Sequence, residues 1–239
     1  MSLTIVNINC EMHRHLDTIL PFLEKTEPDI VCLQEVYEHD VVHFAHATNS
    51  TSFFAPNAIY YTEGIAGDAQ ELGVGYLTND QTAKAETVDY FRADTPLEFA
   101  NPTHGYNWRR SLIVVHETRA QVPFHLATTH FTWTPHGDPD DAQRVSQQIL
   151  MKKLSSYEDV LLVGDLNAPR GGEIYKTFTR EYTDHVPQDY TTSIDMNLHR
   201  AGDVGLVVDH VLSRGTVPVR SVAYRFGVSD HAAIVIEVD

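Results

Sequence analysis

The chain has 239 residues, of which 42% are hydrophobic, so it is long and apolar enough to fold as one large domain over residues 1–239. Its 33 acidic residues outnumber 17 Lys and Arg, and the net charge of −16 disfavours broad, non-specific binding to nucleic acid. The charge does not exclude a nuclease, because cations bound at a carboxylate-rich site reverse it locally.

The cysteines and the N-terminus predict a cytoplasmic protein. Cys10 and Cys32 are the only cysteines, and both lie in apolar, strand-like stretches, as buried thiols in a reducing compartment do. Residues 1–5 lack the basic and apolar regions of a signal peptide. No run of residues is long and apolar enough to span a bilayer, so we expect no stable association with membranes.

The N-terminal part predicts two strands that end in polar residues. Residues 3–10 form an apolar, β-branched run in which Asn7 and Asn9 share one face by the period of two. An amphipathic helix is expected over residues 14–25. Residues 30–33 predict a second buried strand, and Glu35 follows it, where a carboxylate buried without a partner or a metal is costly.

Three histidines accompany a helix expected around residues 41–48. His39, His43 and His46 are spaced by three and four residues, a spacing that can bind zinc. Because neither an HExxH pattern nor a third ligand accompanies them, a solvated helix face is favoured over a zinc site.

The middle of the chain favours strands. Short strands are expected at 53–54, 59–61 and 72–77, with loops at 63–71 and 95–107. The second loop leads through Trp108 to Arg109 and Arg110 and a strand at 111–116. Adjacent strand residues face opposite ways, so at most one of the two arginines meets a ligand.

The next part predicts a strand, a helix and a second strand. Residues 124–131 form the first strand, with His130 at its far end. A helix is expected to begin with Asp138 as N-cap and Pro139 at the first position. Its apolar stripe is predicted from Val145, Ile149, Leu150 and Leu154.

Residues 160–163 form a short apolar strand that ends at Gly164, where the backbone needs conformational freedom. Asp165 and Asn167 follow in a loop. A helix at 173–182 and strands at 204–212, 217–226 and 232–238 complete the expected elements. Asp209 interrupts an apolar strand, and Asp230 and His231 lie in the last loop.

Candidate site residues therefore recur at strand ends all along the chain. They are Asn7, Glu35, His130, Asp165, Asn167, Asp209, Asp230 and His231. A set of acids, amides and histidines without cysteine, in which oxygen ligands predominate, favours Mg²⁺ or Mn²⁺ over structural zinc. Hydrolysis of phosphoesters is the chemistry that suits such a site.

The order of these motifs resembles the endonuclease/exonuclease/phosphatase superfamily, whose members include deoxyribonuclease-I-like nucleases and inositol polyphosphate 5-phosphatases. The resemblance spans residues 6 to 231 and rests on six motifs in the family's order. They are Val6-Asn7-Ile8, Gln34-Glu35-Val36, Thr129-His130-Phe131, Gly164-Asp165-Leu166-Asn167, Val208-Asp209-His210-Val211-Leu212 and Ser229-Asp230-His231. The resemblance implies an α/β fold, a four-layer sandwich of two packed, mostly antiparallel mixed sheets flanked by helices.

The resemblance also implies residue roles. Glu35 would be the principal metal ligand, with Asn7 beside it and Asp230 completing the metal side. Asp165 would orient or deprotonate the attacking water, or join a second metal site, and Asn167 would hold a phosphate oxygen. His231, fixed by Asp209, would act as acid/base or electrostatic stabiliser. His130 matches the hydrolase branches, where it would stabilise the transition state or assist the leaving group.

The resemblance implies a monomeric, Mg²⁺-dependent phosphoesterase for which Mn²⁺ can substitute. A nuclease or DNA-end-processing phosphodiesterase acting on DNA or RNA stands slightly ahead of a hydrolase for small, lipid or inositol phosphoesters. The sequence has no long basic segment, and Arg109 and Arg110 are the main candidates for phosphate contact, beside Arg144 and Arg170. A non-catalytic binding protein is the alternative of another class, but such proteins usually lose a ligand that is present here.

Overall fold

Two six-stranded sheets form the framework of the computed structural model, which describes residues 2–61, 69–99, 108–120 and 122–239. The first sheet has the order β11 (Val219–Arg225), β12 (Ala233–Val238), β1 (Leu3–Asn9), β2 (Ile30–Tyr37), β4 (Ala69–Thr78) and β3 (Thr51–Tyr61). The second has the order β5 (Ala85–Phe91), β6 (Arg110–Glu117), β7 (Phe124–Thr129), β8 (Val160–Asp165), β10 (Asp209–Arg214) and β9 (Thr183–Asp184). The pairs β1–β2 and β7–β8 are parallel, and the other pairs of these ladders are antiparallel.

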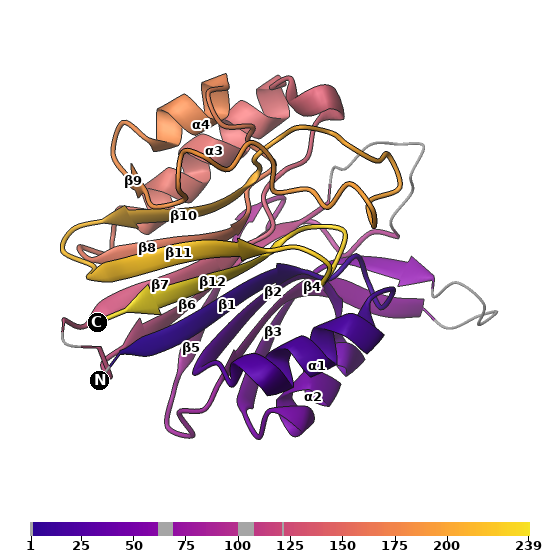
Figure 1. Ribbon diagram of the computed structural model, residues 1–239. Coiled ribbons are helices and arrows are strands. Elements are labelled where there is room, and N and C mark those ends of the chain that lie inside the picture. Colours follow the sequence, from indigo (N-terminus) through magenta and orange to yellow (C-terminus); the bar gives the residue numbers. More distant parts are fainter. Residues whose placement is uncertain (1, 62–68, 100–107, 121) are drawn as a thin grey trace.

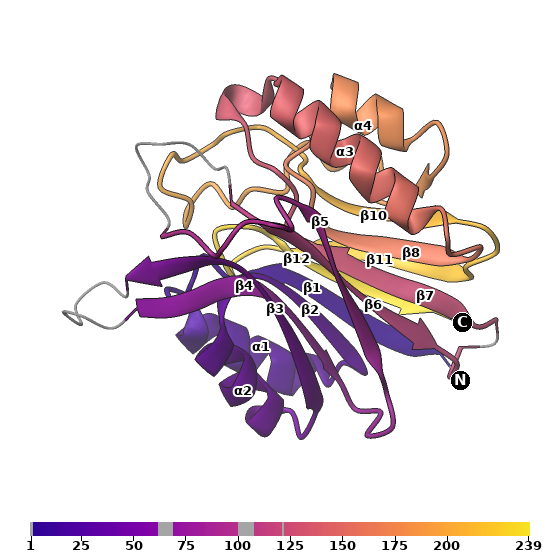
Figure 2. The same cartoon turned by 180° about the vertical axis from the view of Figure 1, so that it is seen from behind.

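Helices cover the outer faces of both sheets, as Figure 1 and its reverse view in Figure 2 show. The helices α1 (Leu16–Thr26) and α2 (Glu38–Ala47) lie against the first sheet, and α3 (Asp141–Leu154) and α4 (Glu173–Phe178) lie against the second. This arrangement confirms the expected four-layer sandwich of mixed sheets. None of the described helices is long and apolar enough to cross a membrane.

Alternation along the strands decides which side chains face the space between the sheets. In β1, Leu3 and Ile5 belong to the core between the sheets, whereas Val6 and Ile8 pack towards α1 and α2. Asn7 and Asn9 continue the inward set, because strand side chains alternate between the faces. By the same alternation Asp165 follows the inward Leu161 and Val163 of β8. The inward polar residues therefore converge at one end of the sandwich.

A β-bulge in β2 orients Glu35. Between Leu33 and Val36 the strand advances three residues while β4 advances two, from Gly75 to Gly73. Glu35 adopts a left-handed conformation with φ of 47° at this point. Since a bulge redirects the side chain that it carries, Glu35 turns towards the end of the sandwich.

The structure corrects the predicted start and stripe of the third helix. Asp140, not Asp138, is the N-cap of α3, and its Oδ1 accepts a 2.7 Å hydrogen bond from the Gln143 backbone N–H. Pro139 thus precedes the cap. Val145 and Ile149 are exposed, because the inward face of α3 is largely polar and bonds to loops, as described below.

Several other predicted elements differ in extent. Residues 204–208 do not pair as a strand, because the carbonyls of Val207 and Val208 accept hydrogen bonds from Arg170 and Leu166 in the loop after β8. The predicted strands around 53–61 form one long strand, β3, and β4 already begins within the predicted loop 63–71. Residues 62–68 and 100–107 of the two predicted loops lie outside the described residues. Helix α4 ends at Phe178, earlier than expected.

Candidate active site

The converging strand ends form the floor of a cleft of about 400 Å³. Seven of the ten predicted site residues line it: Glu35, Arg110, His130, Asp165, Asn167, Asp230 and His231. The structure thus brings together residues from both sheets that are up to 196 positions apart, the separation of Glu35 and His231. Three predicted residues, Asn7, Arg109 and Asp209, do not line the cleft.

Asp209 lies behind His231 and holds it. The Asp209 Oδ2 lies 2.8 Å from His231 Nδ1, and Asp209 is fully buried at the start of β10. Burial alone lowers the pKa of His231, but the charge and hydrogen bond of Asp209 outweigh it and raise this pKa well above its usual value. His231 is therefore held as an imidazolium. Asp209 bonds to its Nδ1 and not to its Nε2.

Asp165, Glu35 and His130 form a compact group on the floor. His130 Nε2 lies 3.6 Å from both Glu35 Oε1 and Asp165 Oδ2. Burial, followed by repulsion from Arg110 and His231, lowers the pKa of His130 far below its usual value, so this imidazole is neutral. Burial and the neighbouring Asp209 raise the pKa of Asp165 to about 7.

The loop after β8 is fixed by hydrogen bonds. Asp165 Oδ1 accepts a 2.8 Å bond from the Asn167 backbone N–H, and Asn167 has a left-handed φ of 44°. The Asn167 side chain donates to the Phe131 carbonyl at 3.2 Å. Gly164 has φ of 150°, and a side chain there would meet the Thr129 carbonyl oxygen at 2.1 Å. This confirms that the backbone needs glycine at that point.

A buried glutamine of α3 supports this loop and was not predicted as functional. Gln143 Nε2 donates to the carbonyls of Thr132 at 2.8 Å and Asn167 at 3.1 Å. Gln143 therefore joins the segment after His130 to the segment after Asp165. No sequence signal pointed to Gln143, because the predicted apolar stripe placed Val145 and Ile149 on the buried face instead.

Asn9, rather than Asn7, contacts the floor carboxylates. Asn9 Nδ2 lies 3.1 Å from Asp165 Oδ2 and 3.4 Å from Glu35 Oε1. Asn7 Oδ1 instead accepts a 2.8 Å hydrogen bond from Gln34 Nε2, deeper between the sheets. Both asparagines share the predicted face, but only Asn9, the last residue of the strand, bonds to carboxylates that line the cleft.

The two adjacent arginines diverge, as the alternation rule predicts. Arg109 forms a 3.3 Å ion pair with Asp89 and also donates to the Thr95 carbonyl. Arg110 is fully buried, donates to the His130 carbonyl at 3.3 Å, and stacks over the Trp108 ring at 5.6 Å. The other two candidate arginines are engaged elsewhere, Arg144 with Glu173 at 2.7 Å and Arg170 with Asp184 at 3.4 Å.

The upper walls of the cleft are aromatic and apolar. None of the wall residues was predicted from the sequence as a site residue. The aromatic side comes from Tyr60, Trp108 and Trp133, and the apolar side from the segment before β10. The apolar residues are Ile194, Val204, Leu206 and Val208. These segments have no regular period, so their convergence depends on the tertiary structure.

The acidic floor has the donor chemistry of a hard divalent cation. Burial raises the pKa of Glu35 and of Asp230, and for Glu35 the charge of Asp230 raises it further. Ligand atoms of Glu35, His130 and Asp165 lie within 4.8 Å of one another, and so do those of Glu11, His15 and Asp230. A divalent cation here would relieve the repulsion among these carboxylates. The predicted ligands Glu35 and Asp230 belong to different groups, and the donors of each group suit such an ion.

The chain matches one family model over most of its length. The model, described as the endonuclease/exonuclease/phosphatase family, matches residues 6–231. No curated protein matches the chain significantly.

Solved structures share this fold at low sequence identity. A functionally unknown conserved protein from Enterococcus faecalis V583 has a TM-score of 0.72 and 19% identity, with 99% of each chain covered. A mannosyl-6-phosphatase of Bacteroides thetaiotaomicron VPI-5482 has a TM-score of 0.71 and 14% identity, again with 99% of each chain covered. The human Nocturnin catalytic domain with bound sulfate has a TM-score of 0.70 and 16% identity, covering 100% of this chain and 93% of that one. The chain belongs to the endonuclease/exonuclease/phosphatase family and is a phosphoester hydrolase.

Proposed function

We propose that the protein hydrolyses phosphodiester or phosphomonoester bonds with Mg²⁺, which Mn²⁺ can replace. The main support is the group of Glu35, His130 and Asp165 on the cleft floor, in which His130 Nε2 lies 3.6 Å from both carboxylates. The imidazolium of His231 lies in the same cleft. Glu35 and Asp230 would hold the ion, which would supply positive charge to the phosphoryl oxygens. Asn7, bonded to Gln34, would act on this site by keeping Gln34 and β2 in place.

Asp165 would take the proton of the attacking water. Its pKa of about 7 means that a substantial fraction is ionised at neutral pH, and a base is most effective when its pKa lies near the working pH. The Asn167 N–H fixes Oδ1 of the carboxylate, which leaves Oδ2 beside Asn9 and His130. Asn167 would also orient a phosphoryl oxygen from its place in the cleft.

The two histidines would act in different protonation states. His231 would be the positive group that stabilises charge on the phosphoryl oxygens or protonates the leaving oxygen, and Asp209 would keep it protonated. His130, neutral by burial, would donate or accept one hydrogen bond at the reacting group. Arg110 would position His130 through its carbonyl. Arg109, paired with Asp89, would lie outside the phosphate site.

The walls of the cleft favour a phosphoester that carries a flat or apolar group. The first candidate is the end of a DNA or RNA strand, because Tyr60, Trp108 and Trp133 offer rings on which a base can stack. The second candidate is a small phosphoester. It is favoured by the net charge of −16 and by a cleft of about 400 Å³, the size of a small-molecule site. The mannosyl-6-phosphatase among the structural neighbours also supports it.

We also propose that residues 1–239 act as a single catalytic domain and as a monomer in the cytoplasm. Buried Cys10 and Cys32, both free thiols, support a reducing compartment. The presence of the predicted acids and histidines in one cleft supports catalysis over a purely binding role.

A phosphoester panel tests the proposal. Wild type, Glu35→Gln and the exposed control Glu24→Gln would be assayed with Mg²⁺, Mn²⁺ or EDTA. The panel would hold single- and double-stranded DNA, RNA, an abasic duplex, a 5′-tyrosyl oligonucleotide, sugar and inositol phosphates, sphingomyelin and an aryl phosphodiester. We expect metal-dependent cleavage of one class, retained by Glu24→Gln and lost by more than about 100-fold in Glu35→Gln.

The outcomes separate the candidates. Cleavage confined to strand ends would support the first candidate, and cleavage confined to sugar or inositol phosphates would support the second. Equal rates for wild type and Glu35→Gln, or full activity in EDTA, would refute the metal site on this floor.

A further inference from the structure

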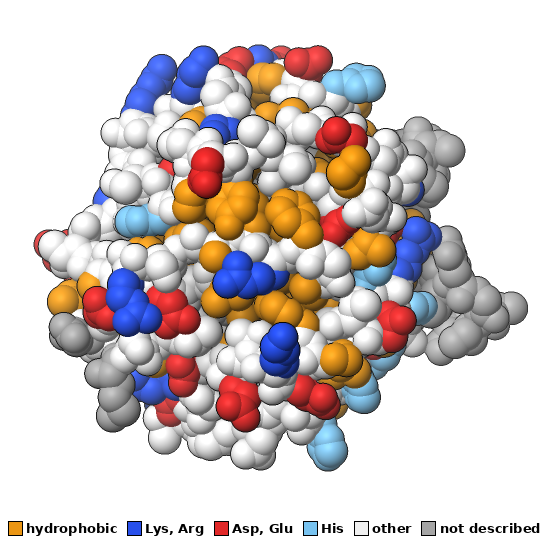
Figure 3. Space-filling view, viewed as in Figure 1, with side chains coloured by type: hydrophobic (Ala, Val, Ile, Leu, Met, Phe, Trp, Pro, Cys, Tyr) orange, Lys and Arg blue, Asp and Glu red, His pale blue; other side chains and the backbone are white. Residues whose placement is uncertain are grey.

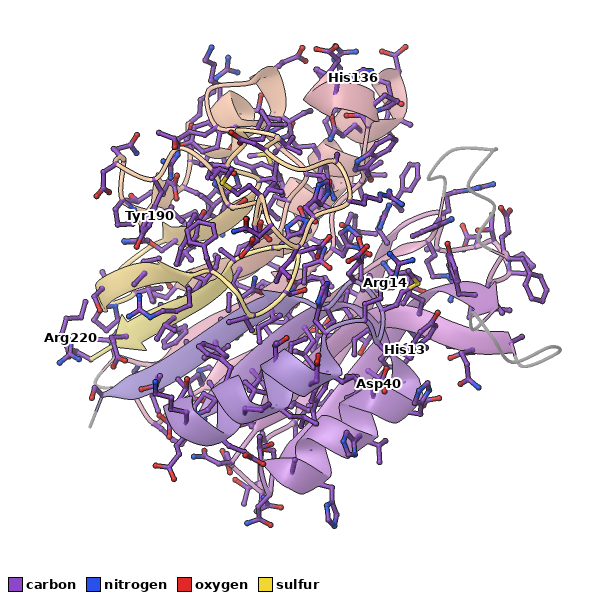
Figure 4. The ribbon with its side chains drawn as sticks, turned by 45° about the vertical axis from the view of Figure 1, so that its right-hand side comes forward. His13, Arg14, Asp40, His136, Tyr190 and Arg220 are labelled. Carbon is purple, nitrogen blue, oxygen red and sulfur yellow. The ribbon has the colours of Figure 1, made fainter. Side chains whose placement is uncertain are left out.

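A second group of ligand-type side chains lies outside the cleft, where the loop after β1 meets the start of α2. It consists of His13 from the loop and His39 and Asp40 from α2. One ligand atom of each lies within 4.8 Å of the others. Figure 4 shows His13 and Asp40 next to one another, and Figure 3 shows histidine side chains along the lower right edge of the molecule.

The backbone holds the two segments together. The Met12 N–H donates a 2.8 Å hydrogen bond to the Glu35 carbonyl, which attaches the loop to the bulge of β2. The Tyr37 ring packs against both imidazoles, with its centroid 5.4 Å from that of His13 and 5.5 Å from that of His39. The ligand positions are therefore supported by packing as well as by sequence proximity.

Asp40 supplies an independent sign of a missing partner. The residue is only 3% exposed, and its Oδ1 lies 3.2 Å from His39 Nε2. Its Oδ2 is buried and has no hydrogen-bond partner in the structure. Burial raises the pKa of Asp40, and the charges of His39, His13 and His43 oppose this rise. A buried carboxylate oxygen without a donor is costly unless a proton or a cation satisfies it.

We propose that His13, His39 and Asp40 form a cation site of their own that binds Zn²⁺ or a similar borderline divalent ion. Two imidazoles and one carboxylate suit Zn²⁺, whereas Mg²⁺ prefers oxygen ligands. None of the three side chains lines the cleft. The three protein ligands leave a further position for water.

An ion at this site would clamp the rim of the cleft. His13 follows Glu11 and Met12, which line the cleft, and His39 comes four residues after Glu35. Coordination would join the loop after β1 to α2 beside the Tyr37 ring. The site would therefore stabilise the segment that carries Glu35 without contacting the reacting phosphate.

Cobalt and zinc titrations test this site separately from the cleft. Metal-stripped protein would be titrated with Co²⁺ and Zn²⁺ in a large excess of Mg²⁺, with the visible Co²⁺ spectrum, the bound-metal stoichiometry and the unfolding temperature as readouts. The variants are His13→Gln, His39→Gln, the cleft variant Glu35→Gln, and His46→Gln as an exposed control on the same helix.

We expect wild type, Glu35→Gln and His46→Gln to bind one equivalent of Zn²⁺ that raises the unfolding temperature. We expect His13→Gln and His39→Gln each to weaken binding by more than about tenfold. Absence of Zn²⁺ binding in excess Mg²⁺ would overturn the proposal. Binding that either histidine variant leaves unchanged, or that Glu35→Gln alone removes, would overturn it as well. None of these readouts depends on hydrolytic activity.

Discussion

Replacing Asp165 by asparagine should stabilise the metal-free protein while abolishing its activity. Asp165 is 2% exposed, and burial together with Asp209 raises its pKa from 3.8 to about 7. Because the folded pKa exceeds the unfolded one, stability falls as pH rises through this interval, and the loss is complete above about pH 7. The charged active site thus weakens the fold.

The size of the effect follows from the pKa interval. Raising the pKa of Asp165 from 3.8 to about 7 corresponds to a loss on the order of 4 kcal/mol in the free energy of unfolding above pH 7. The asparagine variant avoids this penalty but places an amide opposite the Asn9 amide, 3.1 Å away in the wild type, which costs about 1–2 kcal/mol. The free energy of unfolding of the variant should therefore exceed that of wild type by about 2 kcal/mol at pH 8. This difference should shrink towards pH 5.

Urea unfolding at pH 8 and pH 5 in EDTA measures this difference, with Asp189→Asn as the exposed control. Mg²⁺ should then stabilise the wild type more than the variant, because it compensates the charge that the variant lacks. An Asp165→Asn protein that is less stable than wild type at pH 8, or equally stabilised at both pH values, would refute the electrostatic reasoning.

Three further perturbations test the supports of the site. Asp209→Asn should lower the pKa of His231, so the decline of activity at alkaline pH moves to lower pH; an unchanged pH–rate profile would contradict this. Gln143→Leu removes donors to the carbonyls of Thr132 and Asn167 and should cost about 2 kcal/mol in urea unfolding, with a lower kcat; full activity would exclude its positioning role. Gly164→Ala should destabilise by more than about 3 kcal/mol, because its Cβ would meet the Thr129 oxygen at 2.1 Å; a calorimetric midpoint within 2 °C or so of wild type would disprove that close approach.

The sequence by itself was sufficient for the family and the fold class, and it predicted most of the residues that meet in the cleft. Apolar runs predicted the strands, and the resemblance of six motifs to the family implied two packed sheets. The same motifs contain Glu35, His130, Asp165, Asn167, Asp230 and His231, all of which line one cleft. The fold prediction is confirmed because the order of the motifs along the chain identifies the family, whereas the catalytic and metal-binding roles of these residues stay predictions. The predicted start of α3 was wrong because both Asp138 and Asp140 suit an N-cap, and Pro139 favoured the earlier of the two.

Only the tertiary structure decided which of the paired candidates reach the cleft. Arg110 lines the cleft and Asn9 bonds to the floor carboxylate of Asp165, while Asn7 and Arg109 bond elsewhere. Distance from the strand end and the facing sheet select between the members of each pair. The bulge that turns Glu35 depends on its pairing with β4. The aromatic wall, the support from Gln143 and the group of His13, His39 and Asp40 join segments without a common period. Their contacts exist only once both sheets and their helices have packed.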